Sequence, residues 1–137
     1  MATELVIDST VAIRATGSSV ARAALTPYRL IAPPLLWSEV TSAMSEAVWR
    51  KQLTRDAADG LLRVFDGMQI SRLRPAGLYK AAWTIARELG WAKTYDAEFL
   101  ALARLRGCQT VTTDERLLRG GARTGLVVSV GALAVPT

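Results

Sequence analysis

The sequence predicts one α/β domain across residues 1–137, built on a central, mainly parallel sheet of about five strands flanked by helices. Short apolar segments alternate with helix-like segments along the chain, and no linker, internal repeat or low-complexity segment interrupts them. The first apolar segment, residues 4–8, is hydrophobic at successive positions, which is typical of a strand covered on both faces. A length of 137 residues, half of them hydrophobic, is enough for one buried core.

The expected strands cover residues 4–8, 28–32, 69–73, 109–112 and 126–130. Short helical segments follow the first strand to about Leu25. Pro33 and Pro34 end the second strand and open a helix that runs to about Lys51, because proline is tolerated at the first helical position. Thr54 is the expected N-cap of the next helix, since a threonine hydroxyl accepts a free backbone N–H there.

Helices in the second half of the sequence have equally clear start and stop signals. Pro75 is expected to begin a helix that ends at Gly90. Thr94 is expected to cap a further helix that ends at Gly107, because glycine readily takes the left-handed conformation that stops a helix. A short helix over residues 114–119 follows the fourth strand. This alternation of strands and helices predicts a parallel sheet with helical crossovers.

The composition excludes several classes of site. The chain has no histidine, so a ribonuclease that works by histidine acid–base catalysis is excluded. Cys108 is the only cysteine, which excludes an internal disulfide and zinc-finger spacing, and we interpret it as a small core residue. A net charge of +5 is consistent with a polyanionic partner or with an ordinary basic surface. No membrane span or signal peptide is visible, so we expect a cytoplasmic protein that does not enter a membrane.

Four acids lie at strand ends or helix starts: Asp8, Glu39, Asp96 and Asp114. Functional groups of a parallel sheet gather at the carboxyl ends of its strands, so these four positions could converge. A carboxylate beside an apolar strand is costly unless a cation compensates it, and oxygen ligands suit Mg²⁺ or Mn²⁺. An isolated Asp in a first helical turn is ordinarily a cap. The set of four instead favours a metal site that activates water to hydrolyse a phosphoester.

Hydroxyl side chains flank the first and last of these acids: Ser9, Thr10, Thr112 and Thr113. They could orient the carboxylates or serve as local caps and turns. Three further acids fit other roles. Glu98 follows Asp96 by two residues, about 200° around the helix, so we expect it to point away from the site. Glu115 is expected to serve a helix N-terminus and Glu46 to pair with a basic residue one turn on.

Each of the four acids lies in a segment that resembles an acidic motif of the PIN-domain nucleases. Residues 6–12 (VIDSTVA) resemble the opening of that family, and residues 34–40 (PLLWSEV) resemble its second acidic motif. Residues 94–103 (TYDAEFLALA) are similar to the third motif and residues 110–117 (TVTTDERL) to the fourth. In size, motif order and spacing the chain resembles the VapC-like toxins of bacterial toxin–antitoxin pairs.

The resemblance implies a parallel sheet of about five strands and a Mg²⁺- or Mn²⁺-dependent endoribonuclease that cuts RNA of the tRNA or rRNA class. It implies that the metal-binding, catalytic residues are Asp8, Glu39, Asp96 and Asp114. Thr10 and Thr112 match hydroxyls of the family, although many members have Ser or Asn at the position of Thr10.

The resemblance also implies a homodimer and a cognate antitoxin protein that lies along the helices and covers the site. The apolar side chains available for such contacts, which are equally suited to a core, are Trp37, Met44, Trp49 and Leu61. Basic side chains near the acids that could hold RNA phosphates are Arg14, Lys93, Arg116 and Arg119. For any one of them a solvated surface position is the simpler interpretation.

Two other functions use similar features. An aspartyl-phosphate phosphatase of the haloacid dehalogenase type also begins with an Asp at a strand end, but it needs a second acid two residues later, where this chain has Thr10. It also leaves Glu39 without a role. A non-catalytic RNA- or protein-binding module of the same fold would not need all four acids.

Overall fold

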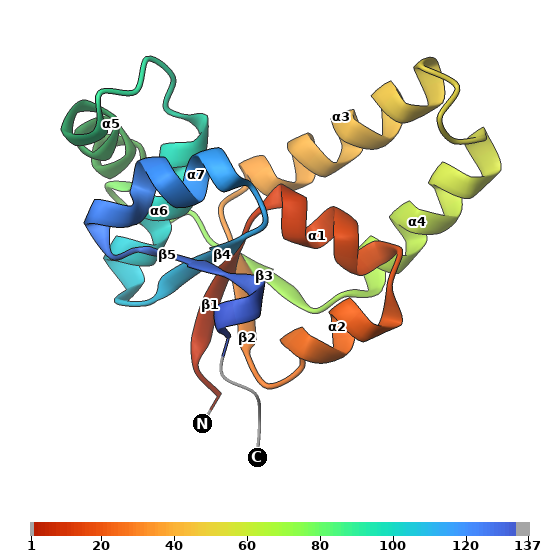
Figure 1. Ribbon diagram of the computed structural model, residues 1–137, viewed down its shortest axis with the longest axis horizontal. Helices are drawn as coiled ribbons and strands as arrows, with labels where there is room; N and C mark the ends of the chain where they lie inside the picture. The colour runs from red at the N-terminus through yellow and green to blue at the C-terminus, as the bar shows by residue number, and fades with distance from the viewer. Residues whose placement is uncertain (1, 134–137) are drawn as a thin grey trace.

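The computed structural model describes residues 2–133, which form a five-stranded, all-parallel sheet with helices around it (Figure 1). The strands, in chain order, are β1 (Glu4–Ile7), β2 (Arg29–Ala32), β3 (Ile70–Arg72), β4 (Gln109–Thr112) and β5 (Val127–Ser129). Their order across the sheet is β3-β2-β1-β4-β5. The α/β class and the sheet of about five strands are confirmed, and β1 lies at the centre between β2 and β4.

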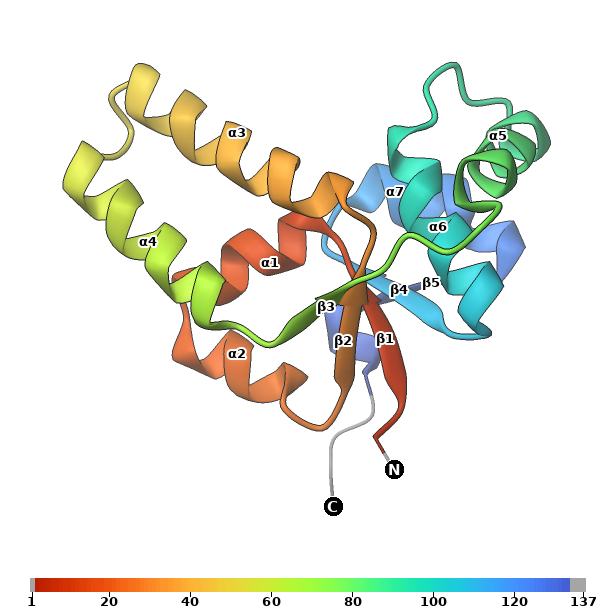
Figure 2. The same ribbon diagram turned by 180° about the vertical axis from the view of Figure 1, so that it is seen from behind.

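The helices form two groups with the strands between them, as both views show (Figures 1 and 2). The first group is α1 (Ser9–Thr16), α2 (Ser19–Leu25), α3 (Leu35–Trp49) and α4 (Arg55–Gly67). The second group is α5 (Leu78–Leu89), α6 (Tyr95–Arg106) and α7 (Glu115–Gly121), with 3₁₀ turns at Ala122–Thr124 and Val130–Ala132. The hairpin of α3 and α4 projects away from the sheet. No helix among residues 2–133 is both long enough and apolar enough to cross a membrane.

Helix α6 is buried on nearly all sides, because it packs against α5, β1 and β4. Its buried apolar residues are Ala97, Phe99, Leu100, Ala101, Leu102 and Ala103. A helix that is apolar on all sides lies in the interior of a protein rather than on its surface. The buried Thr110 hydroxyl donates a hydrogen bond to the Phe99 carbonyl at 3.0 Å, which ties α6 to β4. The first turn of α6 therefore has a fixed position relative to the strand ends.

Helix boundaries differ from the sequence prediction where local conformation overrides residue preference. Helix α5 begins at Leu78 rather than Pro75, because Gly77 takes a left-handed conformation with φ of +83° that interrupts the helix. Thr94 precedes α6 but its side chain makes no capping hydrogen bond. Thr54 does cap α4, accepting a hydrogen bond from the Ala57 N–H at 3.1 Å.

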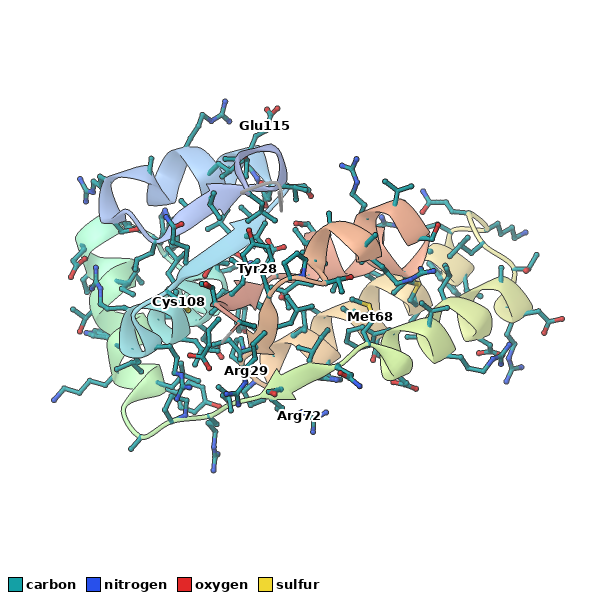
Figure 3. The ribbon with its side chains drawn as sticks, turned by 90° about the horizontal axis from the view of Figure 1, so that it is seen from below. Tyr28, Arg29, Met68, Arg72, Cys108 and Glu115 are labelled. Atoms are coloured by element: carbon teal, nitrogen blue, oxygen red, sulfur yellow. The ribbon has the colours of Figure 1, made fainter. Side chains whose placement is uncertain are left out.

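Cys108 lies between α6 and β4, partly buried and packed against the core, in agreement with its interpretation as a packing residue (Figure 3). Burial raises the pKa of its thiol, which disfavours the reactive thiolate at neutral pH.

Candidate active site

Asp8 stands at the junction of β1 and α1, where the residue is only 4% exposed. It caps α1 by accepting a hydrogen bond from the Val11 N–H at 3.0 Å. Thr10 donates to the Oδ1 atom at 2.7 Å, and Thr112 from the end of β4 donates to the Oδ2 atom. Three donors thus hold both oxygens of one buried carboxylate, which fixes its direction and supports its charge.

The two threonines also join the ends of β1 and β4. The Thr10 hydroxyl accepts a hydrogen bond from the Thr113 N–H at 3.1 Å, and the Thr112 hydroxyl accepts one from the Asp114 N–H at 3.0 Å. Each hydroxyl therefore donates a hydrogen bond to Asp8 and accepts one from a backbone N–H just after β4. This network places the first acid beside the segment that carries the last.

Glu39 and Asp96 line one cleft of about 490 Å³ between α3, α6 and α7. Glu39 is the fifth residue of α3 and Asp96 the second of α6, so two helix starts deliver these carboxylates. The negative charge of Asp96 raises the pKa of both Asp8 and Glu39, and that of Asp114 raises the pKa of Asp96. Asp96 is therefore electrostatically coupled to each of the other three acids.

Glu39 has the most perturbed carboxyl group, with a pKa raised to about 7. Desolvation is the largest cause, and the charges of Asp96, Asp8 and Glu98 act in the same direction. The Ser9 hydroxyl opposes them and lowers this pKa. Burial likewise raises the pKa of Asp8 and of Asp96, although three hydrogen bonds at Asp8 and the Arg116 charge near Asp96 oppose it. The site concentrates more negative charge than its environment readily accommodates.

Asp114 caps α7 by accepting a hydrogen bond from the Arg116 N–H at 2.9 Å. The Nε atom of Arg116 lies 3.8 Å from the Asp114 Oδ1 atom, and the guanidinium is largely exposed. An exposed pair of this kind contributes little to stability. One carboxylate oxygen of Asp114 is thus engaged in capping, and the structure describes no hydrogen bond to the other.

Comparison with known proteins places this chain in a family. Residues 5–122 match the PIN domain model. Over 116 residues the chain is 33% identical to VapC ribonuclease Mb0985 of Mycobacterium bovis and to ribonuclease VapC9 of Mycobacterium tuberculosis, covering 82% of this chain and 87% of each relative. The chain belongs to the PIN-domain family, among its VapC-like members.

Solved structures share the fold of this PIN domain at lower sequence identity. PAE2754 from Pyrobaculum aerophilum superposes with a TM-score of 0.72 at 22% identity, over 97% of this chain and 88% of that one. A toxin–antitoxin complex from Klebsiella pneumoniae gives a TM-score of 0.64 at 19% identity, over 92% of this chain and 97% of that one. At these identities the likeness establishes the architecture.

The acids of this PIN domain suit a hydrated cation rather than a closed cage of protein ligands. Within residues 2–133, no three acidic or cysteine side chains converge closely enough to enclose an ion by themselves. Mg²⁺ commonly keeps several waters and takes only one or two carboxylates together with substrate phosphates. Three carboxyl groups with raised pKa values, coupled to one another by their charges, are an environment that a divalent cation would stabilise. The donor set therefore fits such an ion.

Glu98, which we expected to point away from the site, does not line the acidic cleft, but it is buried rather than exposed to solvent. It is only 8% exposed, burial raises its pKa, and its charge acts on Glu39. The expectation treated α6 as a surface helix with one inward face, whereas α6 is enclosed on several sides. Glu46 is exposed on α3, and Glu115 lies at the outer edge of the molecule in the first turn of α7 (Figure 3).

The basic residues divide into two groups. Lys93 and Arg116 line the acidic cleft, whereas Arg14 and Arg119 lie elsewhere, in the last turns of α1 and α7. A larger cavity of about 740 Å³ lies at the other end of the strands, near Tyr28, Arg29 and Met68, and no acid lines it (Figure 3). The larger cavity is therefore separate from the carboxylates.

Two aromatic residues of the cleft were missed by the sequence reasoning: Trp91 and Tyr95. Tyr95 directly precedes Asp96 in the third acidic motif, so its place beside an acid was visible in the sequence. The exposure of the Tyr95 side chain was not visible there, because this exposure depends on how the preceding loop approaches α7.

If Asp8 is a ligand of Mg²⁺, replacing Thr112 with valine should weaken Mg²⁺ binding about 10- to 100-fold, the usual effect of losing a hydrogen bond that orients a metal ligand. The loss of this donor should also raise the pKa of Asp8 further. Isothermal titration with Mg²⁺ measures the affinity. Thr84→Val, which removes an exposed hydroxyl on α5, is the matched control and should leave it unchanged. Equal Mg²⁺ affinity in the two variants would contradict the role given to Thr112.

Metal-free protein should lose stability as pH rises from about 4.5 to 7. The pKa of Glu39 is about 7 in the folded protein against 4.5 in the unfolded chain, so the folded state binds more protons in this interval. Because Glu39 is partly exposed, we expect a loss of about 1 kcal/mol rather than the full value of the pKa difference. Urea unfolding in EDTA at several pH values measures it.

Glu39→Gln should flatten this pH dependence, and Glu46→Gln, an exposed acid on the same helix, should preserve it. Added Mg²⁺ should stabilise the wild-type protein more at pH 8 than at pH 5. An unchanged slope in Glu39→Gln would mean that another group causes it.

Proposed function

We propose that this PIN-domain protein is a Mg²⁺- or Mn²⁺-dependent endoribonuclease that acts as the toxin of a cytoplasmic toxin–antitoxin pair. The observation that carries the proposal is the cleft lined by Glu39 and Asp96 at the end of the sheet where Asp8 is anchored, with the charges of these three acids acting on one another. The 33% identity to two proteins named as ribonucleases supports the same activity.

The proposed metal ligands are Asp8, Glu39, Asp96 and Asp114. A cation held by these residues would supply polarisation of the scissile phosphoester and a lowered pKa for the attacking water. Thr10 and Thr112 hold the Asp8 carboxylate in one orientation and favour its ionised form. Lys93 and Arg116, at the same cleft, attract the phosphates that flank the bond to be cut. In this proposal the substrate is RNA of the tRNA or rRNA class.

A phosphatase that forms an aspartyl phosphate is not favoured by the site. Such an enzyme needs a second acid two residues after its nucleophilic aspartate, which here would be Asp8. Two residues after Asp8 lies Thr10, whose hydroxyl already donates its hydrogen bond to Asp8. A non-catalytic binding module of the same fold remains the second candidate, and cleavage distinguishes it from the nuclease.

Purified protein should cut total cellular RNA into discrete fragments in Mg²⁺ or Mn²⁺ and leave it intact in EDTA. Asp8→Asn and Asp96→Asn should each lower the rate by about 100-fold or more, because a lost carboxylate removes transition-state stabilisation of several kcal/mol. Asp59→Asn, an exposed acid on α4, is the matched control. Fragments that persist in EDTA or in both site variants would refute the assignment, and binding without cleavage would favour the binding module.

We further propose a homodimer and an antitoxin that contacts the α3–α4 hairpin. Of the apolar residues expected at such contacts, Met44 is part of the core and Trp37 packs against it, with the Arg72 guanidinium 4.3 Å from its ring. Trp49, at the end of α3, is 85% exposed and offers a large apolar surface for a partner.

If a small reading frame lies beside the gene, co-expression with it should yield a stable complex that no longer cuts RNA. Trp49→Ser should weaken that complex at least about 10-fold, whereas Val20→Ser, at a similarly exposed position on α2, should not. Binding is measured by calorimetry, and light scattering should give twice the 14.8 kDa of one chain for the toxin alone. Equal binding by the two variants would remove the hairpin from the antitoxin interface.

A further inference from the structure

The segment between α5 and α6 forms one wall of the acidic cleft. Its lining residues are Gly90, Trp91, Ala92, Lys93 and Tyr95. Tyr95 is the first residue of α6 and directly precedes Asp96, and it is 56% exposed although it belongs to the cleft. An exposed aromatic ring next to a carboxylate of the site has no packing role in the core, and it is available to a ligand.

Several contacts hold this wall in place. Gly90 takes the left-handed conformation that ends α5, and the Trp91 N–H donates to the Ala86 carbonyl at 2.8 Å. Arg87 donates to the Trp91 carbonyl at 2.5 Å. A Cβ atom at Gly120 would stand 3.0 Å from the Trp91 ring, so this ring lies directly against α7. The wall is therefore preorganised, and ordering it on binding costs little.

We propose that Tyr95 stacks on the nucleobase next to the scissile phosphate and thereby positions the RNA strand at the acidic cleft. The inference rests on the proposed nuclease function and names a residue that binds its substrate. Every base has a π face, so stacking on an aromatic side chain is tolerant of sequence. Lys93 and Arg116 on the same cleft carry the charge that follows the backbone. A base paired within a duplex is already stacked and cannot reach the ring.

The position of Tyr95 distinguishes it from the other exposed aromatic residues. Tyr79 and Trp83 on α5 are 55% and 58% exposed, but neither lines the cleft, and the Arg87 guanidinium lies 4.7 Å from the Trp83 ring. Tyr79 is therefore a matched control, with the same side chain and nearly the same exposure.

The experiment measures binding by fluorescence anisotropy in an Asp8→Asn background, which prevents cleavage. The probes are a labelled 12-nucleotide RNA of mixed sequence, the same RNA as a duplex, and an abasic ribose-phosphate chain of equal length and charge. With Tyr95 present, the single strand should bind more tightly than the duplex and about 10-fold or more tightly than the abasic chain. Tyr95→Ala should abolish the preference for bases, Tyr95→Phe should retain it, and Tyr79→Ala should leave it unchanged.

Lys93→Gln separates charge from stacking. It should weaken binding to the RNA and the abasic chain equally and reduce the salt dependence, while the preference for bases persists. If Tyr95→Ala keeps the full preference for bases, the stacking proposal is overturned, although metal-dependent cleavage that requires Asp96 would still support the nuclease. If no single-stranded RNA is bound or cut by the protein with Tyr95, both proposals fail.

Discussion

The site depends on the hydrogen bonds that hold the Asp8 carboxylate between the ends of β1 and β4. Thr10 reaches it from its own helix and Thr112 from the neighbouring strand, and each hydroxyl also accepts a backbone N–H near β4. The direction of Asp8, the position of Asp114 and the alignment of two central strands are therefore parts of one arrangement. Because β1 is the middle strand, the centre of the sheet carries the most buried acid.

Around this anchored acid, the structure concentrates charge of one sign. Burial and mutual repulsion raise the pKa of Asp8, Glu39 and Asp96, and Glu98 adds a further buried carboxyl group. Such a cluster is unfavourable for the stability of a metal-free fold and favourable for holding a cation, which is the usual relation between stability and function. The apolar α6 and the central strands supply the packing that supports it.

Much of this arrangement could be predicted from the sequence, because strand ends in a parallel sheet meet at one edge. Asp8 and Asp114 follow two adjacent strands, so their proximity needs only the strand order. Glu98 could not be placed in this way, because helical periodicity gives an angle around an axis but not what surrounds it. The start of α5 was also misplaced. A proline can begin a turn as well as a helix, and here Pro75 is followed by a turn in which Gly77 is left-handed.

The hydrogen bond between Thr112 and Asp8 joins residues that are 104 positions apart in the chain. Contacts of such long range form late, since the intervening chain must fold first, and translation delivers Asp8 long before Thr112. A nascent chain that lacks β4 has no second donor for Asp8, no Asp114 and only one neighbour for β1. In a protein with the proposed activity, the nuclease site stays incomplete during translation until β4 has joined the sheet. The translating ribosome is therefore not exposed to an active nuclease before the chain is nearly full length.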